Sequence, residues 1–405
     1  MTEKRKSPAL RFRGYTDDWE QRKLGEVTTS YSGGTPMVGV KEYYDGQIPF
    51  IRSAEINSES TELFISEKGL NVSSARLVLK GDILYALYGA TSGEVGRARL
   101  DGAINQAILA IKPMENYDAE YLSQWLRKSK QNIVETYLQG GQGNLSGAIV
   151  KELIVDFPSY NEQQIIGQHF ANLDNCITLH QRKLEKLKLV KKSMLEKMFP
   201  KNGSSVPEIR FNGFTDDWEQ RKLSEIADKV TEKNAGLQYM ETFTNSAEFG
   251  IISQRDFFDH DIAKMSSLGG YYIVRNEDFV YNPRISASAP VGPINRNKLG
   301  RIGVMSPLYT VFRPHDVDTT YLEYFFKSKY WHSFMNFNGD SGARSDRFSI
   351  KDSIFFKMPI PLPYIEEQIK IGKHLTQFDH LITLHQRKVE KLQIMKKSML
   401  EKMFV

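Results

Sequence analysis

The chain has 405 residues, 40% of them hydrophobic, which is enough for two or three domains that each bury a core. Its one cysteine, Cys176, excludes an internal disulfide and a cysteine-based zinc site, and no apolar run is long enough to span a membrane, so a cytoplasmic protein is expected. The formal net charge of +5 is too small to indicate nucleic-acid binding by itself.

An internal repeat organises the whole chain. The block TDDWEQRKL at residues 16–24 recurs letter for letter at 215–223. Two further blocks recur near the end of each half: ITLHQRK at 177–183 and 382–388, and KKSMLEKMF at 191–199 and 396–404. The sequence therefore predicts two copies of one plan, each with a variable region between repeated ends.

The TDDWEQRKL block carries two local predictions. Trp19 and Trp218 are expected to anchor a core rather than to stack on a ligand. Asp17 and Asp216, each followed by glutamate three positions later, are expected to cap short helices.

The two variable regions retain weak sequence similarity to one another. Residues 81–93 align with 277–289, and both begin with the apolar and aromatic residues typical of β-strands. Residues 120–130 align with 320–330, and both have the pattern of an amphipathic helix. Surface loops are predicted at the Gly- and Ser-rich stretches 32–36, 140–147 and 338–346. Each variable region is thus expected to be a mixed α/β domain.

A spacing of four and three residues predicts a coiled-coil seam in each repeated helix, about 50 Å long over its 33 residues. The first seam comprises Ile166, Phe170, Leu173, Ile177, His180, Leu184 and Leu187, continued by Lys191, Met194 and Met198; the second comprises Ile371, Leu375, Phe378, Ile382, His385, Val389 and Leu392, continued by Lys396, Met399 and Met403.

Antiparallel pairing of these helices is favoured over parallel pairing. A parallel register would set His180 beside His385 and Lys191 beside Lys396 in a desolvated seam. An antiparallel register places apolar residues opposite these positions and lets the lysines reach solvent. Cys176 is expected to pack as a small helix residue. The basic stretches 182–197 and 387–402 are either a solvated face or a contact with a partner protein or DNA.

No catalytic constellation is present in the sequence. The Asn/Asp-Pro-Pro-aromatic motif of amino-methyltransferases, a P-loop and the Glu-x-Lys pair of many nucleases are all missing. No histidines have metal-ligand spacing. A binding or scaffolding role, without catalytic or metal-binding residues, is therefore expected.

Over nearly its whole length the chain resembles the specificity subunit of type I restriction-modification systems. The resemblance is carried by the duplicated TDDWEQRKL, by SGGTP at 32–36, and by NEQQIIGQHFANLDNCITLHQRK (161–183) and IEEQIKIGKHLTQFDHLITLHQRK (365–388). It implies two target recognition domains, each reading half of a split double-stranded DNA target, separated by antiparallel helices. The second half departs from the pattern, because residues 229–240 stand in place of SGGTP.

The resemblance also implies partners. The helices would dock methyltransferase subunits, two being expected, and set the spacer, and restriction (motor-nuclease) subunits would join the complex. Catalysis, S-adenosylmethionine, ATP and Mg would belong to those partners, leaving no cofactor for this chain. The alternative is a coiled-coil assembly scaffold whose variable domains bind proteins, and a catalytic DNA-modifying enzyme is a third reading.

The expected fold is mixed α/β with a pseudo-twofold internal repeat. Its expected parts are target recognition domain 1 at 1–160, a first coiled-coil helix at 161–200, a linker at 201–207, target recognition domain 2 at 208–363 and a second helix at 364–405.

Base edges are read chiefly by Arg, Lys, Asn, Gln, Ser and Thr on loops that reach a groove. Aligning the shared strand at an offset of 196 places Tyr88 opposite Arg284, where the common framework ends. These two lead the candidates for DNA contact, although each candidate has an ordinary loop position as its alternative. The others are Gly33, Gly34, Thr35, Arg52, Thr91, Asn105, Gln106, Gln142 and Asn144 in the first domain, and Arg255, Ser286, Arg344 and Arg347 in the second.

Overall fold

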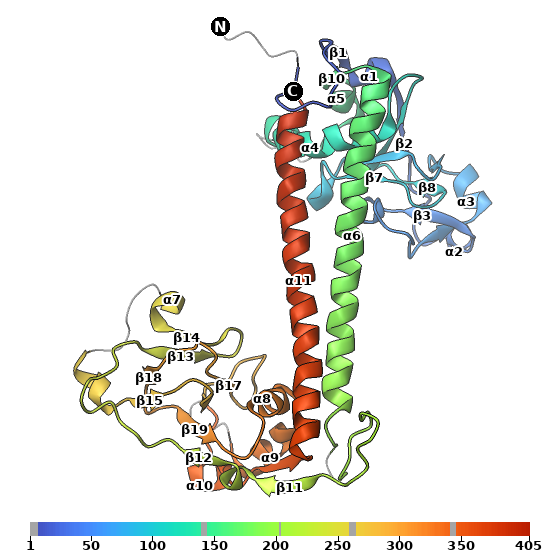
Figure 1. The fold of residues 1–405 in the computed structure, drawn as a ribbon. Helices are drawn as coiled ribbons and strands as arrows, with labels where there is room; N and C mark the ends of the chain where they lie inside the picture. The colour runs from blue at the N-terminus through green and yellow to red at the C-terminus, as the bar shows by residue number, and fades with distance from the viewer. Residues whose placement is uncertain (1–6, 139–143, 202–203, 259–264, 341–345) are drawn as a thin grey trace. The chain divides into compact units, whose positions relative to one another are not determined.

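The computed structural model describes residues 7–138, 144–201, 204–258, 265–340 and 346–405 (Figure 1). It divides into two compact units: unit 1 comprises residues 1–182 and 386–405, and unit 2 comprises residues 183–385. Two long helices, α6 (Tyr160–Lys197) and α11 (Ile365–Met403), contribute residues to both units.

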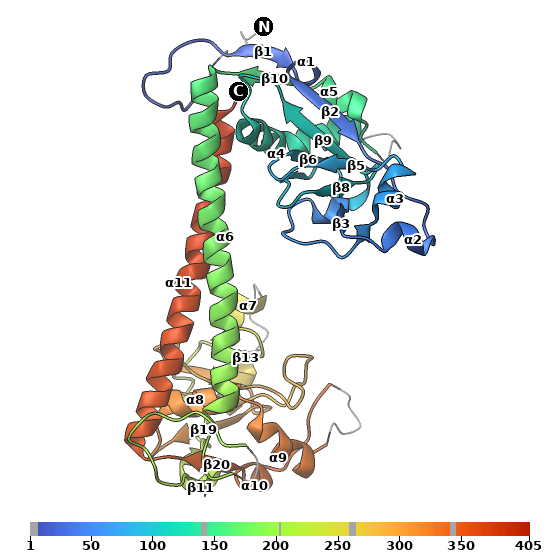
Figure 2. The same ribbon diagram turned by 90° about the vertical axis from the view of Figure 1, so that its right-hand side faces the viewer.

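Two four-stranded sheets form the body of unit 1 (Figure 2). One is antiparallel, with the order β2 (Thr28–Ser32), β9 (Ile108–Pro113), β6 (Ile83–Ala86) and β7 (Val95–Arg97). The other has the order β4 (Phe64–Ile65), β3 (Ile48–Ile51), β8 (Gly102–Ile104) and β5 (Arg76–Val78), with β3 parallel to β8. The helical segments are α1 (Leu24–Val27), α2 (Lys41–Tyr44), η1 (Ser53–Glu55), α3 (Glu67–Asn71), η2 (Gly89–Thr91), α4 (Ala119–Tyr137) and α5 (Gly147–Lys151).

Strand β6 separates two cores in unit 1, because successive side chains point to opposite faces of a sheet. Ile83 and Tyr85 join a core that includes residues of α4, the start of α6 and the end of α11. Leu84 and Ala86 join a second core with residues of β3, β8 and β9, so the two sheets pack face to face. This alternation is why the strand is apolar throughout.

Unit 2 repeats the antiparallel sheet with the order β12 (Ala227–Lys229), β19 (Thr310–Pro314), β16 (Phe279–Tyr281) and β17 (Ile294–Arg296). Beside it lie two ladders, β13 (Phe243–Ser246) with β14 (Gly250–Ser253) and β15 (Tyr272–Val274) with β18 (Gly303–Met305). The helical segments are η3 (Leu223–Glu225), α7 (Gln254–Phe258), η4 (Met265–Gly270), α8 (Thr319–Lys327), α9 (Tyr330–Asn338) and α10 (Asp352–Phe355). The strands and helices predicted at 81–93, 277–289, 120–130 and 320–330 are confirmed, although the last helix ends at Lys327.

The TDDWEQRKL block is a strand in both units, not a capped helix. Its EQRK residues form β1 (Glu20–Lys23), paired with β10 (Ile154–Phe157), and β11 (Glu219–Lys222), paired with β20 (Pro359–Leu362). The prediction that Asp17 and Asp216 cap helices is wrong, because the backbone that follows them is hydrogen-bonded to a distant strand. Trp19 and Trp218 are buried in the cores, as predicted.

In each unit the long helices pair in antiparallel fashion. In unit 1 the rings of Phe170 and Phe404 are 5.9 Å apart, and Asp174 binds Lys396 at 2.6 Å, so numbers rise along α6 as they fall along α11. In unit 2 Lys191 of α6 binds Asp379 of α11 at 2.5 Å, while Met198 shares a core with Ile371 and Leu375. All predicted seam positions are buried or half-buried.

The prediction that the seam lysines reach bulk solvent is wrong. The side chains of Lys191 and Lys396 are only 18% and 15% exposed, and each ends on an aspartate of the other helix. An ion pair across the helices therefore neutralises each lysine within its own unit. Cys176 is exposed, so its predicted packing role is also wrong.

Candidate nucleic-acid interface

Most candidates of unit 1 gather at one edge of the antiparallel sheet, where β2 and β6 end and β9 begins. The backbone N–H of Gly33, after β2, donates to the carbonyl of Asn105 at 3.2 Å. Thr35 Oγ1 donates to Gln106 Oε1 at 2.8 Å. At the end of β6, Tyr88 forms an antiparallel bridge with Asn144, and Thr91 Oγ1 donates to the Tyr88 carbonyl.

The two glycines of SGGTP have a packing role. A Cβ on Gly33 would lie 1.8 Å from the carbonyl oxygen of Ile104, and one on Gly34 would lie 2.6 Å from the Cβ of Ser74. Only glycine permits this approach of the loop to its neighbours. The polar surface that the loop presents therefore comes from Thr35 and its partner Gln106, both exposed.

Arg52 is engaged within its own loop. Its Nη2 lies 2.6 Å from Glu55 Oε1 and 2.7 Å from Glu62 Oε2. The hydrogen bonds from Arg52 lower the pKa of Glu55 to about 2. A guanidinium held by two carboxylates is not presented to DNA in this conformation, so the structure does not support Arg52 as a base contact.

The candidates of unit 2 lie at the matching sheet edge. Arg284 and Ser286 follow β16, and Arg284 forms an antiparallel bridge with Arg347. These three residues line a cavity of about 550 Å³. Arg255 lies on the exposed side of α7, whose Phe257 lines the same cavity. Gln142 and Arg344 lie outside the described residues.

Tyr88 and Arg284 occupy equivalent positions. Tyr88 is the second residue after β6 and Arg284 the third after β16, and each bridges a segment that returns from near the end of the variable region. The preceding residues match as well: Leu145 N donates to the Leu87 carbonyl at 3.0 Å, and Phe348 N donates to the Pro283 carbonyl at 2.7 Å. One backbone frame therefore carries different side chains in the two units.

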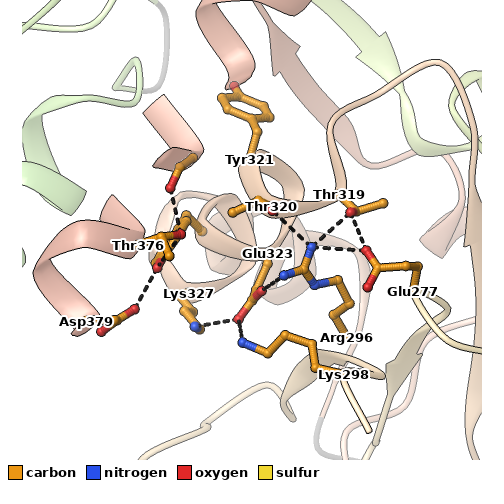
Figure 3. Close-up of polar contacts among 12 residues, drawn as sticks. Glu277, Arg296, Lys298, Thr319, Thr320, Tyr321, Glu323, Lys327, Thr376 and Asp379 are labelled. Carbon is orange, nitrogen blue, oxygen red and sulfur yellow. Dashed lines mark hydrogen bonds and ion pairs between the residues drawn. The ribbon is translucent and has the colours of Figure 1, made fainter. Parts of the chain in front are cut away.

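A charged network behind the sheet of unit 2 was missed from the sequence (Figure 3). Glu323 of α8 is 7% exposed and binds Arg296, Lys298 and Lys327 at 2.7, 2.8 and 2.6 Å. Burial opposes ionisation, but Lys327 and Lys298 hold the pKa of Glu323 at about 2. No repeat pointed to this glutamate, because Ser123 stands at the aligned position of the first half.

A second missed feature is a bidentate ion pair in each unit. Arg11 binds Glu162 through Nε and Nη2 at 2.7 and 2.8 Å, and Arg210 binds Glu367 in the same way at 2.8 and 2.8 Å. The sequence carried a signal for it, since Arg-Phe precedes both TDDWEQRKL blocks and both glutamates begin the repeated helices. Each pair fixes the segment before the block to a long helix.

Other kinds of site are not evident in the described parts of the chain. Among those residues, no three or more His, Cys, Asp or Glu side chains are grouped to hold a metal ion. None of the helices described has the length and apolar content needed to cross a bilayer.

Comparison with known families follows the same division of the chain. The family model for the type I restriction modification DNA specificity domain matches residues 16–189 and again 215–393. The chain belongs to this family. Each half is thus one DNA specificity domain, and the resemblance inferred from the repeated blocks is confirmed.

Some known members of the family are similar to this chain over most of their length. The type I restriction enzyme MjaVIII specificity subunit of Methanocaldococcus jannaschii is 22% identical over 399 residues, covering 95% of this chain and 91% of that protein. The crystal structure of the type I restriction-modification S subunit from M. genitalium superposes with a TM-score of 0.61 at 12% identity, covering 98% and 99% of the two chains. A chain from a type I R-M system, solved to explain complex assembly and conformational transition, gives a TM-score of 0.50 at 17% identity and 96% and 98% coverage.

Proposed function

We propose that the chain is the non-catalytic DNA specificity subunit of a type I restriction-modification complex, with each unit reading one half of a bipartite target. The observation that carries the proposal is the bridge at each sheet edge. Tyr88 with Asn144 and Arg284 with Arg347 are set on the same backbone frame, yet they present different chemistry. Equal frames with unequal side chains are what two readers of different base sequences require.

The side chains at the two edges favour different bases. Unit 1 presents the hydroxyl of Thr35 and the amides of Gln106 and Asn144, and amide side chains pair best with adenine in the major groove. Unit 2 presents Arg284 and Arg347, and arginine pairs best with the O6 and N7 atoms of guanine. The half-site of unit 2 is therefore proposed to contain guanine.

The long helices are proposed to dock two methyltransferase subunits. Apolar side chains remain exposed at matching positions, with Leu179 at 64% and Leu384 at 51%, and Leu189 at 67% and Ile394 at 71%. Each pair is 205 residues apart, so a partner that binds one helix finds apolar side chains at the same positions on the other. Exposed apolar side chains that recur in this way favour a protein partner.

The remaining functions are assigned to those partners. S-adenosylmethionine would bind the methyltransferase subunits, and ATP and Mg would act in the complex with restriction subunits. The helices, which contribute to both units, would set the spacer between the half-sites.

Exchange of one variable region tests the proposal. Residues 26–155 would be replaced by the corresponding segment of a relative with a different target, and the modified motif would be read by methylome sequencing of cells that carry the complex. One half of the motif should change while the other stays. A motif in which both halves change together, or neither changes, would contradict independent reading. A matched exchange in unit 2 should alter the opposite half.

A further inference from the structure

Arg97 of unit 1 is a half-buried cation with one loose ion pair. It ends β7, its side chain is 26% exposed, and its nearest carboxylate oxygen, Oε2 of Glu120, is 3.6 Å from Nη1. Its guanidinium makes no hydrogen bond to any residue that the structure describes. Burial lowers the pKa of Arg97, and Glu120 opposes this shift only in part. Arginine stays charged in proteins, and a buried charge is stable only when it is paired.

Unit 2 shows what the same position requires. Arg296 ends β17 as Arg97 ends β7, and in both units the next residue accepts the same backbone bond, from Gly81 to Ala98 and from Glu277 to Asn297, each at 2.9 Å. Both Nη groups of Arg296 have partners within unit 2 (Figure 3). Nη1 bonds Glu277, Thr319 and Thr320 at 3.2, 2.8 and 3.1 Å, and Nη2 bonds Glu323 at 2.7 Å. Nε is buried without a partner in both arginines, so the difference lies in the Nη groups.

Most of these partners are missing around Arg97. Gly81 aligns with Glu277, Ala119 with Thr319 and Ser123 with Glu323. A Cβ on Gly81 would lie 3.7 Å from Nη2 of Arg97, so the guanidinium faces the position from which Glu277 reaches Arg296 in unit 2. Unit 1 instead has Glu120 at the position of Thr320, and this carboxylate lies 3.6 Å from Nη1 of Arg97. Arg97 therefore has one loose ion pair where Arg296 is bonded to the carboxylates of Glu277 and Glu323.

Arg97 also lines an open cavity of about 860 Å³ within unit 1. The other basic side chains of its wall are Arg99, Arg127, Arg182 and Lys396. Arg182 is paired with Glu59, and Lys396 and Arg127 share Asp174. Arg99 is exposed and has no ion pair within the described part of the chain. The wall also holds the carboxylates of Glu59, Glu94, Glu120 and Asp174 and the hydroxyls of Ser58, Ser60 and Thr178, so its five cations outnumber its four anions by one.

We propose that this cavity binds a phosphate group through Arg97 and Arg99, in place of the carboxylates that unit 2 supplies from its own chain. The planar donor fork of arginine matches the two non-bridging oxygens of a backbone phosphate, and in free phosphate a further oxygen remains for the hydroxyls of the wall. In a DNA complex the group is a backbone phosphate, and this assignment rests on the proposed function. Free phosphate has the same chemistry and is the other source.

Inorganic phosphate tests the cavity without DNA. The unfolding temperature of the full chain would be followed as phosphate replaces chloride at constant pH and ionic strength. The wild-type temperature should rise and saturate, because a ligand bound only to the folded state stabilises it. Arg97→Gln should abolish the rise, whereas Arg22→Gln, which removes an exposed arginine paired with Glu20, should keep it.

A charge-filling variant separates binding from folding. Gly81 has φ +96°, and its counterpart Glu277 has φ +72°, so the backbone of unit 2 already carries a glutamate in this conformation. In Gly81→Glu the introduced carboxylate should pair with the Arg97 guanidinium, and the protein should stay folded but no longer respond to phosphate. Gly81→Ala has the same backbone constraint without the carboxylate and should keep the response.

The salt dependence of DNA binding by the assembled complex distinguishes the two sources. If the cavity holds a backbone phosphate, Arg97→Gln should lower the slope of log K against log salt by about 0.9 and leave the target sequence unchanged. A phosphate response with an unchanged slope assigns the cavity to free phosphate. A wild-type chain that shows neither effect overturns the proposal. A phosphate response in a complex that lacks sequence-specific DNA binding would contradict the proposed function alone.

Discussion

Replacing Glu162 by glutamine is expected to destabilise unit 1 strongly. The Glu162 side chain is fully buried, and both its oxygens accept from Arg11, which is itself 13% exposed. Removing one partner of a buried ion pair leaves the other charge uncompensated and costs about 3–5 kcal/mol in unfolding free energy. At about 2–4 °C per kcal/mol for a domain of this size, the unfolding temperature of unit 1 should fall by roughly 6–20 °C.

Differential scanning calorimetry of the full chain measures this loss. Glu367→Gln provides the matched variant in unit 2, because Arg210 holds Glu367 with the same bidentate geometry. Glu152→Gln is the control: the pair of Lys23 with Glu152 is 49% and 65% exposed and should contribute less than about 1 kcal/mol. Losses below about 1 kcal/mol in both Glu162→Gln and Glu367→Gln would refute the reasoning that these pairs fix the segments before the repeated blocks.

Three further outcomes are expected. Arg347→Ala should weaken binding by about 1–3 kcal/mol and relax specificity only in the half-site of unit 2, whereas Arg52→Ala should leave the motif unchanged; competition binding against half-site variants checks both, and a loss in the other half-site would contradict the assignment. Glu323 has a pKa of about 2 against an ordinary 4.5, so its stabilising effect is complete above about pH 4.5 and is lost as the pH falls towards 2. Urea unfolding should therefore show a gap between wild type and Glu323→Gln that is constant from pH 7 to 5 and narrows below, and a constant gap down to pH 3 would oppose this. Leu179→Asp combined with Leu384→Asp should prevent co-purification of methyltransferase subunits without lowering the unfolding temperature, and full retention of those subunits would show that they bind elsewhere.

The parts of the fold that repeat or have a short period were predictable from the sequence. The seam followed from the spacing of residues such as Phe170 and Leu375, because the buried stripe of a paired helix returns every three or four positions. The strand at Ile83–Ala86 followed from its β-branched and aromatic residues, since burial on both faces leaves no polar alternation.

Features that depend on distant partners were not predictable. Asp17 has the local pattern of a helix cap, but the pairing of β1 with β10 more than 130 residues away decides the conformation that follows. The aspartates that neutralise Lys191 and Lys396 belong to the other helix, so no local pattern marks them. Apart from Tyr88 and Arg284, which the alignment of the two halves indicated, the candidates for DNA contact were found from residue type and loop position. These could not show that Arg52 is held by its own loop while Thr35 and Gln106 are presented together.

The strand ladders that close each variable region bear on how new specificities arise. Leu24 N donates to the Leu153 carbonyl at 2.8 Å, and Leu223 N donates to the Met358 carbonyl at 2.9 Å, so the chain leaves each variable region beside the point where it entered. A segment whose two ends are hydrogen-bonded neighbours can be lengthened, shortened or exchanged by recombination without moving the helix that follows it. The second variable region, six residues longer than the first, has already done so, since the repeat offset grows from 199 to 205 across it. Selection can therefore act on each variable region as a separable unit of inheritance.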